Sequence, residues 1–301
     1  MNISGIPHIG EIFALLTAMI WAAAVILFKK SGETVHPIAL NLFKNALGAV
    51  LIVPTIYLVN GNLTSEFSFA DVSLLLFSGA LGIGIADTLF FMSLNRLGAA
   101  LSSIVDCLYS PMVITAAVIW LGERLTFMQL VGVALIISAV LEASGFGNAN
   151  STTRKGIWFG VLWGVLSMAF MAVGIVIVKP LLETQSLMWI MLIRLMGGIG
   201  TLLVILLFNR NRVSILRTLS VQHSWGYLLT GSFVGAYLAL IAWLAGLKYT
   251  QASQASALNQ TSNVFVFILA AVYLKEPMTR QRVIGIILAA IGVYLVTFYA
   301  G

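Results

Sequence analysis

Ten stretches of about 20 mostly apolar residues follow one another along the chain, with short polar connections between them. A helix of about 20 residues crosses the hydrocarbon core of a bilayer, where every backbone polar group must be hydrogen-bonded internally. The sequence therefore predicts an all-α integral membrane protein with ten transmembrane helices. The expected helices are residues 9–28, 37–58, 72–94, 98–120, 127–146, 156–178, 187–208, 224–246, 251–273 and 281–299.

Composition supports this class and excludes others. Apolar residues make up 60% of the 301 residues and charged residues 9%, whereas soluble domains have about 45–50% and about 25%. The basic residues behind the net charge of +6 stand singly or in small groups, so they do not form the aromatic-interleaved stripe of a nucleic-acid-binding protein. Cys107 is the one cysteine, which excludes a disulfide framework and a multi-cysteine metal site. We expect no metal or cofactor, and a location in the cell (inner or plasma) membrane.

The two halves of the chain resemble each other. A shift of 153 residues aligns residues 94–142 with the second half without a gap. A shift of 150 residues places Lys29 on Lys179 and Lys44 on Arg194. The most informative matches under the first shift are Glu123 with Glu276, Thr126 with Thr279, Gly132 with Gly285, and Asp106 with Asn259.

Each half has an odd number of spans, so the second half must enter the membrane in the opposite sense. This arrangement is the inverted repeat of secondary transporters, which bind substrate near the bilayer midplane between the repeats. The expected organisation is a first five-helix repeat (residues 1–146), a polar linker (147–155) and a second five-helix repeat (156–301).

These features carry a family resemblance. Each half contains the signature Leu-x-Glu-x-x-Thr-x5-Gly, Trp21 lies in the first span, and the basic residues Lys44 and Arg194 lie in the second and seventh. With its ten spans, the chain resembles the EamA-type branch of the drug/metabolite transporter superfamily over essentially its whole length. The resemblance implies a substrate carrier, often an exporter of small metabolites or amino acids, without fixing the substrate. Lys44, where an arginine is more usual, and the aspartates Asp87 and Asp106 depart from the family pattern.

Four ionisable side chains lie at membrane depth: Lys44, Asp87, Asp106 and Arg194. A charge at the centre of a membrane helix costs about 2.5–3.5 kcal/mol on insertion scales. Three interpretations are open: an internal ion pair such as Lys44 with an aspartate, snorkelling of Lys44 to the interface, or charges that face a water-filled cavity. In the third, Lys44 and Arg194 bind a substrate carboxylate, and Asp87 or Asp106 binds an ammonium group or carries a coupling proton.

The fourth and ninth spans are rich in polar residues. Positions four apart share a helix face, which gives one stripe of Ser102, Asp106 and Ser110 and an equivalent face of Ala255, Asn259 and Asn263. We expect the two faces to meet across a pseudo-two-fold axis as cavity walls, with interhelical hydrogen bonding alone as the alternative. Pro111 removes a backbone hydrogen bond, so it should bend the fourth span and free a carbonyl to line the cavity.

Two aromatic and two acidic positions complete the set of candidates. Trp21 and Trp243 could stack on a substrate or pack in the core, and we include both in the predicted binding site. Glu123 and Glu276 lie at span ends, where they are interpreted as boundary or capping residues.

The charges favour a small zwitterion such as an amino acid, because a cationic drug fits badly with Lys44 and Arg194 and an anionic sugar phosphate fits badly with two aspartates. We predict a secondary transporter, an exporter, that works by alternating access in the lipid bilayer with protons as a candidate coupling ion, as a monomer or homodimer. A non-transporting scaffold or a lipid-intermediate flippase subunit is the alternative. An intramembrane enzyme is more remote, because His-Glu-x-x-His, Gly-x-Ser-x-Gly and P-loop motifs are absent.

The orientation of the termini follows from counting basic residues. Eleven lysines and arginines lie in the odd-numbered connections, against three in the even-numbered connections and termini, with Lys44 and Arg194 left out. Basic residues favour the cytoplasmic side, so this count predicts both termini outside. The family resemblance implies cytoplasmic termini, and both orientations stay open at this point.

Overall fold

A computed structural model describes residues 8–60, 67–121, 126–144, 151–220, 225–250 and 252–298, in which the regular structure is helical. Nine helical stretches in these ranges are long and apolar enough to cross a membrane. Large apolar side chains such as Leu58 (82% exposed) and Phe208 (86%) point outward, as lipid-facing side chains do. The expected all-helical membrane fold is confirmed. The nine stretches are Ile9–Ser31, Pro37–Leu58, Phe69–Leu97, Ala99–Trp120, Phe127–Ser144, Lys155–Val176, Leu187–Phe208, Trp225–Tyr249 and Gln254–Tyr273.

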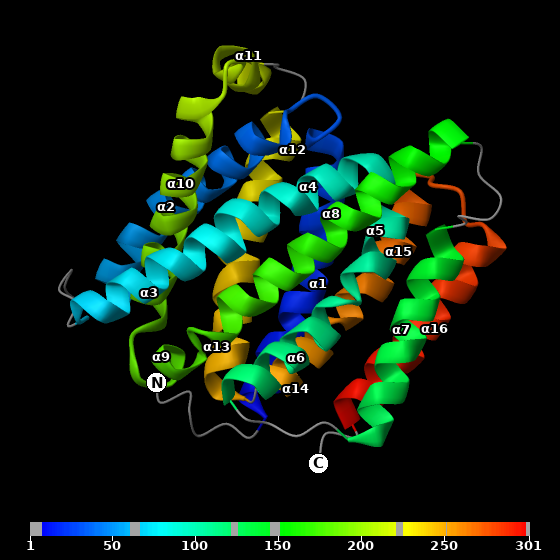
Figure 1. The fold of residues 1–301 in the computed structure, drawn as a ribbon. Coiled ribbons are helices and arrows are strands. Elements are labelled where there is room, and N and C mark those ends of the chain that lie inside the picture. The colour runs from blue at the N-terminus through cyan, green and yellow to red at the C-terminus, as the bar shows by residue number, and fades with distance from the viewer. Residues whose placement is uncertain are drawn as a thin grey trace.

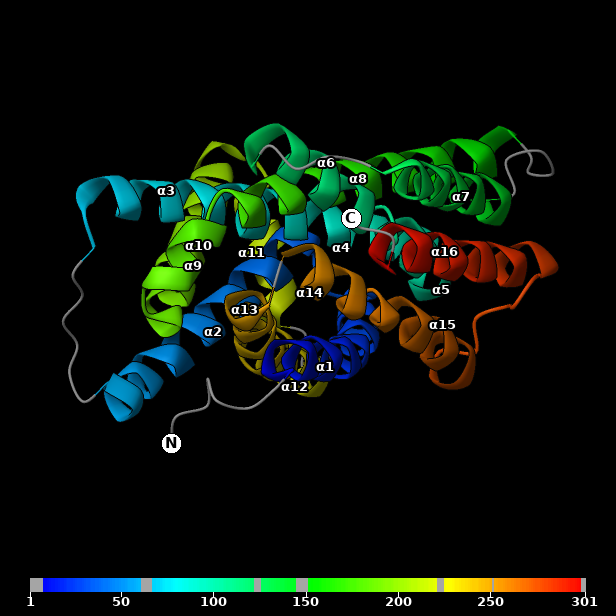
Figure 2. The same ribbon diagram turned by 90° about the horizontal axis from the view of Figure 1, so that it is seen from below.

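Five of the stretches are single helices, and the remaining four are interrupted. The single helices are α1 (Ile9–Ser31), α2 (Pro37–Asn60), α7 (Phe127–Ser144), α8 (Ser151–Val176) and α10 (Leu187–Phe208). The tenth expected helix is α16 (Arg280–Phe298), which packs along α7. Both views show α7 and α16 side by side at one edge of the bundle (Figures 1 and 2).

Helix ends follow local sequence more than hydropathy. The third span begins at Phe69, three residues before the apolar run suggested, because Ser68 and Asp71 form a capping box. The Asp71 amide donates to Ser68 Oγ (3.1 Å) and the Ser68 amide donates to Asp71 Oδ2 (3.2 Å). Within the predicted linker over residues 147–155, residues 151–155 begin α8. Polar residues end the lipid-facing part of a helix without ending the helix, and residues 147–150 lie outside the described ranges.

The packing of α7 on α16 shows that the halves are inverted. A Cβ on Gly132 would lie 2.6 Å from the carbonyl oxygen of Gly292, and one on Gly285 would lie 3.1 Å from that of Ala139. Residue numbers fall along one helix as they rise along the other, so the two helices are antiparallel. Because Gly132 is equivalent to Gly285, and Ala139 to Gly292, each contact maps onto the other when the halves are exchanged. The duplicated, inverted architecture is thus present in the packing.

The fourth and ninth spans are broken at equivalent positions. The fourth span was expected to bend, whereas the break in the ninth corrects its prediction as a continuous helix. The fourth span consists of α5 (Ala99–Asp106) and α6 (Tyr109–Leu121), and the ninth of α14 (Ala252–Asn259) and α15 (Thr261–Tyr273). Pro111 accounts for the bend in the fourth span, because its missing N–H leaves the carbonyl of Cys107 without its helical partner. The ninth span breaks at Gln260 with no proline nearby, so crossing of the two spans must also favour the break.

The third and eighth spans contain π-helical segments at equivalent positions. The third span runs through α3 (Phe69–Gly79), η2 (Ala80–Ile85) and α4 (Ala86–Leu97). The eighth runs through α12 (Trp225–Ser232), η5 (Phe233–Ala239) and α13 (Leu240–Tyr249). A π-helical turn holds an extra residue and is frequent at functional sites. Three short helices join the spans: α9 (Lys179–Thr184), α11 (Arg212–Arg217) and η3 (Thr218–Ser220). In Figure 1, α9 and α11 lie at opposite ends of the bundle.

Candidate substrate cavity

A cavity of about 130 Å³ lies between the two halves and is lined by residues of both. Its walls come from α1, α2, α4, α8, α10 and α13, from both π-helical segments, and from the breaks in the fourth and ninth spans. The lining residues sit in the middle of their spans, as expected for a midplane site. Eight of the nine predicted binding residues line it: Trp21, Lys44, Asp87, Asp106, Arg194, Trp243, Asn259 and Asn263.

The ninth predicted residue, Ser110, is buried outside the cavity lining. The prediction assumed a continuous helix in which Asp106 and Ser110 share a face. The chain instead breaks at residues 107–108, so Ser110 lies in the first turn of α6 and has lost that register. The same break brings Tyr109 into the lining, where the stripe argument did not place it.

The two broken spans meet at their breaks. Gln260 Nε2 donates to the backbone oxygen of Asp106 (3.3 Å), and Asn263 Nδ2 donates to Cys107 Sγ (3.3 Å) and to Gln260 Oε1. Cys107 and Gln260 are equivalent under the repeat, so this crossing lies on the pseudo-two-fold axis. The polar faces of the two spans therefore meet, as expected, and part of their polarity serves interhelical hydrogen bonding. Sequence reasoning missed Gln260, although its polarity next to Asn259 was a usable signal.

Lys44 and Asp87 form a buried ion pair that joins α2 to α4. Both side chains line the cavity, and the Lys44 ammonium also lies 5.7 Å from the ring centroid of Phe91. Beside them, Asn41 Nδ2 donates to the carbonyl oxygens of Ile83 (2.8 Å) and Gly84 in the π-helical segment η2. Two of the three interpretations of Lys44 thus combine: it is internally paired and it faces the cavity.

Arg194 is the repeat equivalent of Lys44 but has no equivalent acid. The π-helical segments of the third and eighth spans begin 153 residues apart, at Ala80 and Phe233. Under that shift Leu240, which also lines the cavity, corresponds to Asp87. Arg194 is 4% exposed, and its Nε has no hydrogen-bond partner among the described residues. Asp87 is near enough to attract it, but that carboxylate is held by Lys44. The hydroxyl of Tyr109, which interacts with Ser256, also lies close to Arg194.

Asp106 and Asn259 occupy equivalent positions at the ends of α5 and α14. Among the described residues nothing donates to the Asp106 carboxylate; Gln260 reaches only its backbone oxygen. The side-chain oxygen of Asn259 is buried and equally unpartnered in the described ranges. Two acceptors of the cavity wall are therefore free to bind a donor.

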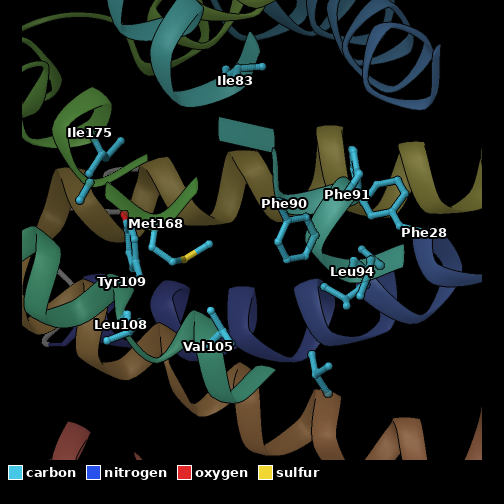
Figure 3. Close-up of a cluster of buried hydrophobic side chains, with 14 of the residues drawn as sticks. Phe28, Ile83, Phe90, Phe91, Leu94, Val105, Leu108, Tyr109, Met168 and Ile175 are labelled. Carbon is cyan, nitrogen blue, oxygen red and sulfur yellow. The ribbon is translucent and has the colours of Figure 1, made fainter. Parts of the chain in front are cut away.

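Aromatic side chains form the apolar part of the cavity. Trp21 lies with its ring centroid 5.9 Å from that of Phe90, and Trp243 lies 6.3 Å from Tyr109. Figure 3 shows Phe90 grouped with Phe91 and other buried side chains, and Tyr109 beside a methionine at the other side of the cluster. The two predicted tryptophans both contact other rings and face the cavity, so stacking on a substrate and core packing are not exclusive.

The comparisons with known proteins fit this architecture. The model of the EamA-like transporter family matches residues 8–144 and 158–298. The chain belongs to the EamA-like transporter family. Each match covers one half, so the chain contains two EamA domains, and its resemblance to the family is confirmed.

Similar proteins carry transporter names without a stated substrate. A protein of Archaeoglobus fulgidus named "Uncharacterized transporter" is 23% identical over 95% of this chain and 97% of its own length. One of Clostridium kluyveri with the same name is 21% identical over 94% and 91%, and "Uncharacterized transporter YvbV" of Bacillus subtilis is 24% identical over 69% and 68%. A solved structure titled "Crystal structure of protein" matches the fold with a TM-score of 0.69 at 15% identity, over 97% of this chain and 96% of that one.

The EamA transporter is thus an integral membrane transporter with small-molecule substrates as its implied cargo. Within the described residues, no group of three or more His, Cys, Asp or Glu side chains is placed to hold a metal.

Proposed function

We propose that this transporter exports small zwitterionic metabolites, with amino acids as the first candidates, by alternating access around the cavity between its halves. Arg194 binds the substrate carboxylate, and Asp106 binds the ammonium group or exchanges a coupling proton. Trp21 and Trp243 contact the apolar part of the substrate, and Lys44 and Asp87 hold the first-half wall in shape.

The proposal rests on one observation: Lys44 and Arg194 occupy equivalent positions in the two halves, but only Lys44 has an acidic residue as its partner. Lys44 has an aspartate for a partner, whereas Arg194 has Leu240 where that aspartate would be. A buried guanidinium without a counter-ion is costly in lipid and is suited to bidentate binding of a carboxylate. The free carboxylate of Asp106 in the same cavity supplies the opposite charge. A ligand with both charges compensates both groups.

The alternative functions account for fewer of these observations. A scaffold does not need two unpaired charges in a cavity between its halves, and packing alone would favour their pairing or replacement. A subunit that flips a lipid intermediate is compatible with an anion-binding Arg194 but leaves the Asp106 carboxylate without a role.

The decisive experiment is counterflow into liposomes that contain the purified full-length protein. A panel of labelled amino acids identifies an exchanged substrate, which is then compared with its decarboxylated amine and its deaminated acid. We expect each truncated probe to exchange at least about tenfold more slowly, because each loses a charge-assisted hydrogen bond. Equal exchange of the amine would remove Arg194 from carboxylate binding. Failure of every probe would favour a scaffold or flippase.

A second variant tests the observation itself. Leu240→Asp gives Arg194 the counter-ion that Lys44 already has, and it should abolish counterflow while the protein still folds. Leu240→Asn, which has the same shape without the charge, is the matched control and should keep more of the activity. Equal activity of the two variants would contradict the role of Arg194.

A further inference from the structure

The turn between α4 and α5 is held by a glutamate of the other half. The Ala99 amide donates to Glu276 Oε1 (2.7 Å) and the Ala100 amide donates to Glu276 Oε2 (3.0 Å). These amides are among the N-terminal donors of α5 that have no partner within the helix, and the N-terminus of a helix favours a negative charge. Glu276 lies between α15 and α16, so it caps a helix of the first half from the second.

The residue before each partner in this contact has a positive φ angle. Gly98, just before Ala99, has a φ of 80°, and a Cβ there would lie 2.8 Å from the Glu276 carboxylate. Lys275, just before Glu276, has a φ of 53°, which is unusual for a residue other than glycine. Such a conformation persists only where the surroundings impose it.

A lysine of the first half binds the same turn from its other end. Lys29 Nζ donates to the carbonyl oxygens of Leu94 (3.3 Å) and Asn95 (3.4 Å) at the end of α4, and Glu276 attracts it electrostatically. The second half repeats this lysine contact at the opposite membrane face. There, Lys179 Nζ donates to the carbonyl oxygens of Leu247 (2.5 Å) and Thr250 (3.0 Å). The repeat equivalent of Glu276 is Glu123, which lies outside the described residues.

Buried side chains lie between Phe90 of the cavity wall and the turn that Glu276 holds. Phe90 lines the cavity, and the residues that follow it along α4 toward Gly98, Phe91 and Leu94, are fully buried. Phe28 of α1 packs on Phe91 with ring centroids 5.1 Å apart. Figure 3 shows Phe28, Phe90, Phe91 and Leu94 gathered as one cluster. This cluster and the Glu276 contact lie in series between the cavity and the membrane face where Glu276 lies.

We propose that Glu276 is a latch that holds the transporter shut at this face: its carboxylate fixes the start of α5 to the second half, and it must leave the α5 amides before the cavity opens there. The proposal rests on the alternating access of the proposed function. It makes Glu276 a positioning residue for Asp106, which lies at the far end of the same half-helix. The glutamate of the Leu-x-Glu-x-x-Thr signature, which the sequence analysis interpreted as a boundary or capping residue, thus caps a helix of the other half.

The test measures the accessibility of a reporter cysteine on each side of the cavity. Leu94→Cys reports on the Glu276 side, and Leu247→Cys, at the equivalent position, reports on the other; both leucines are fully buried. The parent protein, whose single Cys107 is buried, gives the background. A hydrophilic maleimide is added to the full-length protein in detergent, with and without Glu276→Gln. The amide of glutamine leaves one α5 amide without an acceptor.

We expect Glu276→Gln to raise the labelling rate at Leu94→Cys about tenfold, which corresponds to the loss of one charge-assisted hydrogen bond, and to lower the rate at Leu247→Cys. Glu276→Asp, which keeps the charge, should give an intermediate shift. Glu142→Gln, the same change at an exposed glutamate of α7, should change neither rate.

Unchanged rates, or equal rises at both reporters, would overturn the latch, because a cap with a purely structural role loosens the protein without a preferred side. Size-exclusion chromatography before labelling identifies variants that do not fold, and Glu276→Asp then decides the outcome. The assay needs no substrate, so its result is separate from the success or failure of counterflow.

Discussion

Four charged side chains line one cavity at membrane depth, and only two of them are paired with each other. The Lys44–Asp87 pair is neutral as a unit, so its cost in the membrane is offset internally. Arg194 and Asp106 gain no such compensation from the described residues. At the residue scale, the molecule therefore separates charges that maintain structure from charges that are free to meet a ligand.

The ion pair predicts a specific pattern of stability. Asp87→Leu, which copies Leu240 of the second half, leaves Lys44 buried without a partner and should destabilise the protein by about 3–5 kcal/mol. Lys44→Leu combined with Asp87→Leu should recover most of that loss, because no unpaired charge remains. Thermal unfolding in detergent measures both. If the single variant melted at the wild-type temperature, the pair would not be important for the fold.

Asp106 predicts a separation of exchange from coupling. Asp106→Asn makes α5 match α14, whose equivalent residue is Asn259, so the fold should be retained. If Asp106 carries the coupling proton, the variant should still exchange substrate but lose its response to an imposed proton gradient in liposomes. Wild-type gradient dependence would remove Asp106 from that role and leave Asp87 as the next candidate.

At the scale of elements, the interruptions of the helices position the site. The breaks at residues 107–108 and at Gln260, and the π-helical segments η2 and η5, all lie in the middle of spans and at equivalent places in the two halves. Each supplies cavity-lining residues. The regular helices α7 and α16 make a close contact of their own at Gly132 and Gly292.

Deletion of Leu81 tests the π-helical segment η2. Removal of one residue should convert the segment into α-helix and keep the register of the flanking helices α3 and α4. We expect a protein that inserts and folds but has lost counterflow, because Gly82 and Ile83 no longer face the cavity. Counterflow at the wild-type rate would show that the irregular turn is not needed for transport.

Close helix contact predicts an asymmetry between two glycines. Gly132→Leu places side-chain atoms where α16 passes within 2.6 Å of the added Cβ, so it should destabilise the protein by about 1–3 kcal/mol through overpacking. Gly200→Leu is the matched control, because nothing lies within 4 Å of a Cβ there. Melting temperatures in detergent compare the two. Equal melting of both variants would contradict the packing seen between α7 and α16.

Much of this organisation can be predicted from the sequence. The features that could not be predicted share one physical cause. Apolar runs report where lipid surrounds the chain, and the Glu, Thr and Gly spacing reports the duplication, so both were predicted. An apolar run does not reveal the backbone hydrogen-bond register. The break in the ninth span and the π-helical segments were therefore missed, and Ser110 lies outside the cavity lining. Pairing of Lys44 with Asp87, rather than with Asp106, depends on distances between helices, which no local pattern contains.

At the scale of the whole molecule, the distribution of basic residues predicts the orientation. The odd-numbered connections carry eleven lysines and arginines against three on the other side, so both termini should lie outside the cytoplasm. A reporter that fluoresces only in the cytoplasm, fused after Gly301, should stay dark in whole cells. Bright cells would favour the orientation that the family resemblance implied, and a fusion in an odd-numbered connection is the control.

The contact between α7 and α16 has a consequence beyond packing. When the two halves are exchanged, the contact between Gly132 and Gly292 becomes the contact between Gly285 and Ala139. An interface that maps onto itself is the isologous type through which identical subunits form closed two-fold dimers. The single chain thus has the geometry that an antiparallel homodimer of five-helix proteins would have. In such a dimer, copies of one sequence must insert into the membrane in both directions. In a fused chain, each half needs to insert in only one direction.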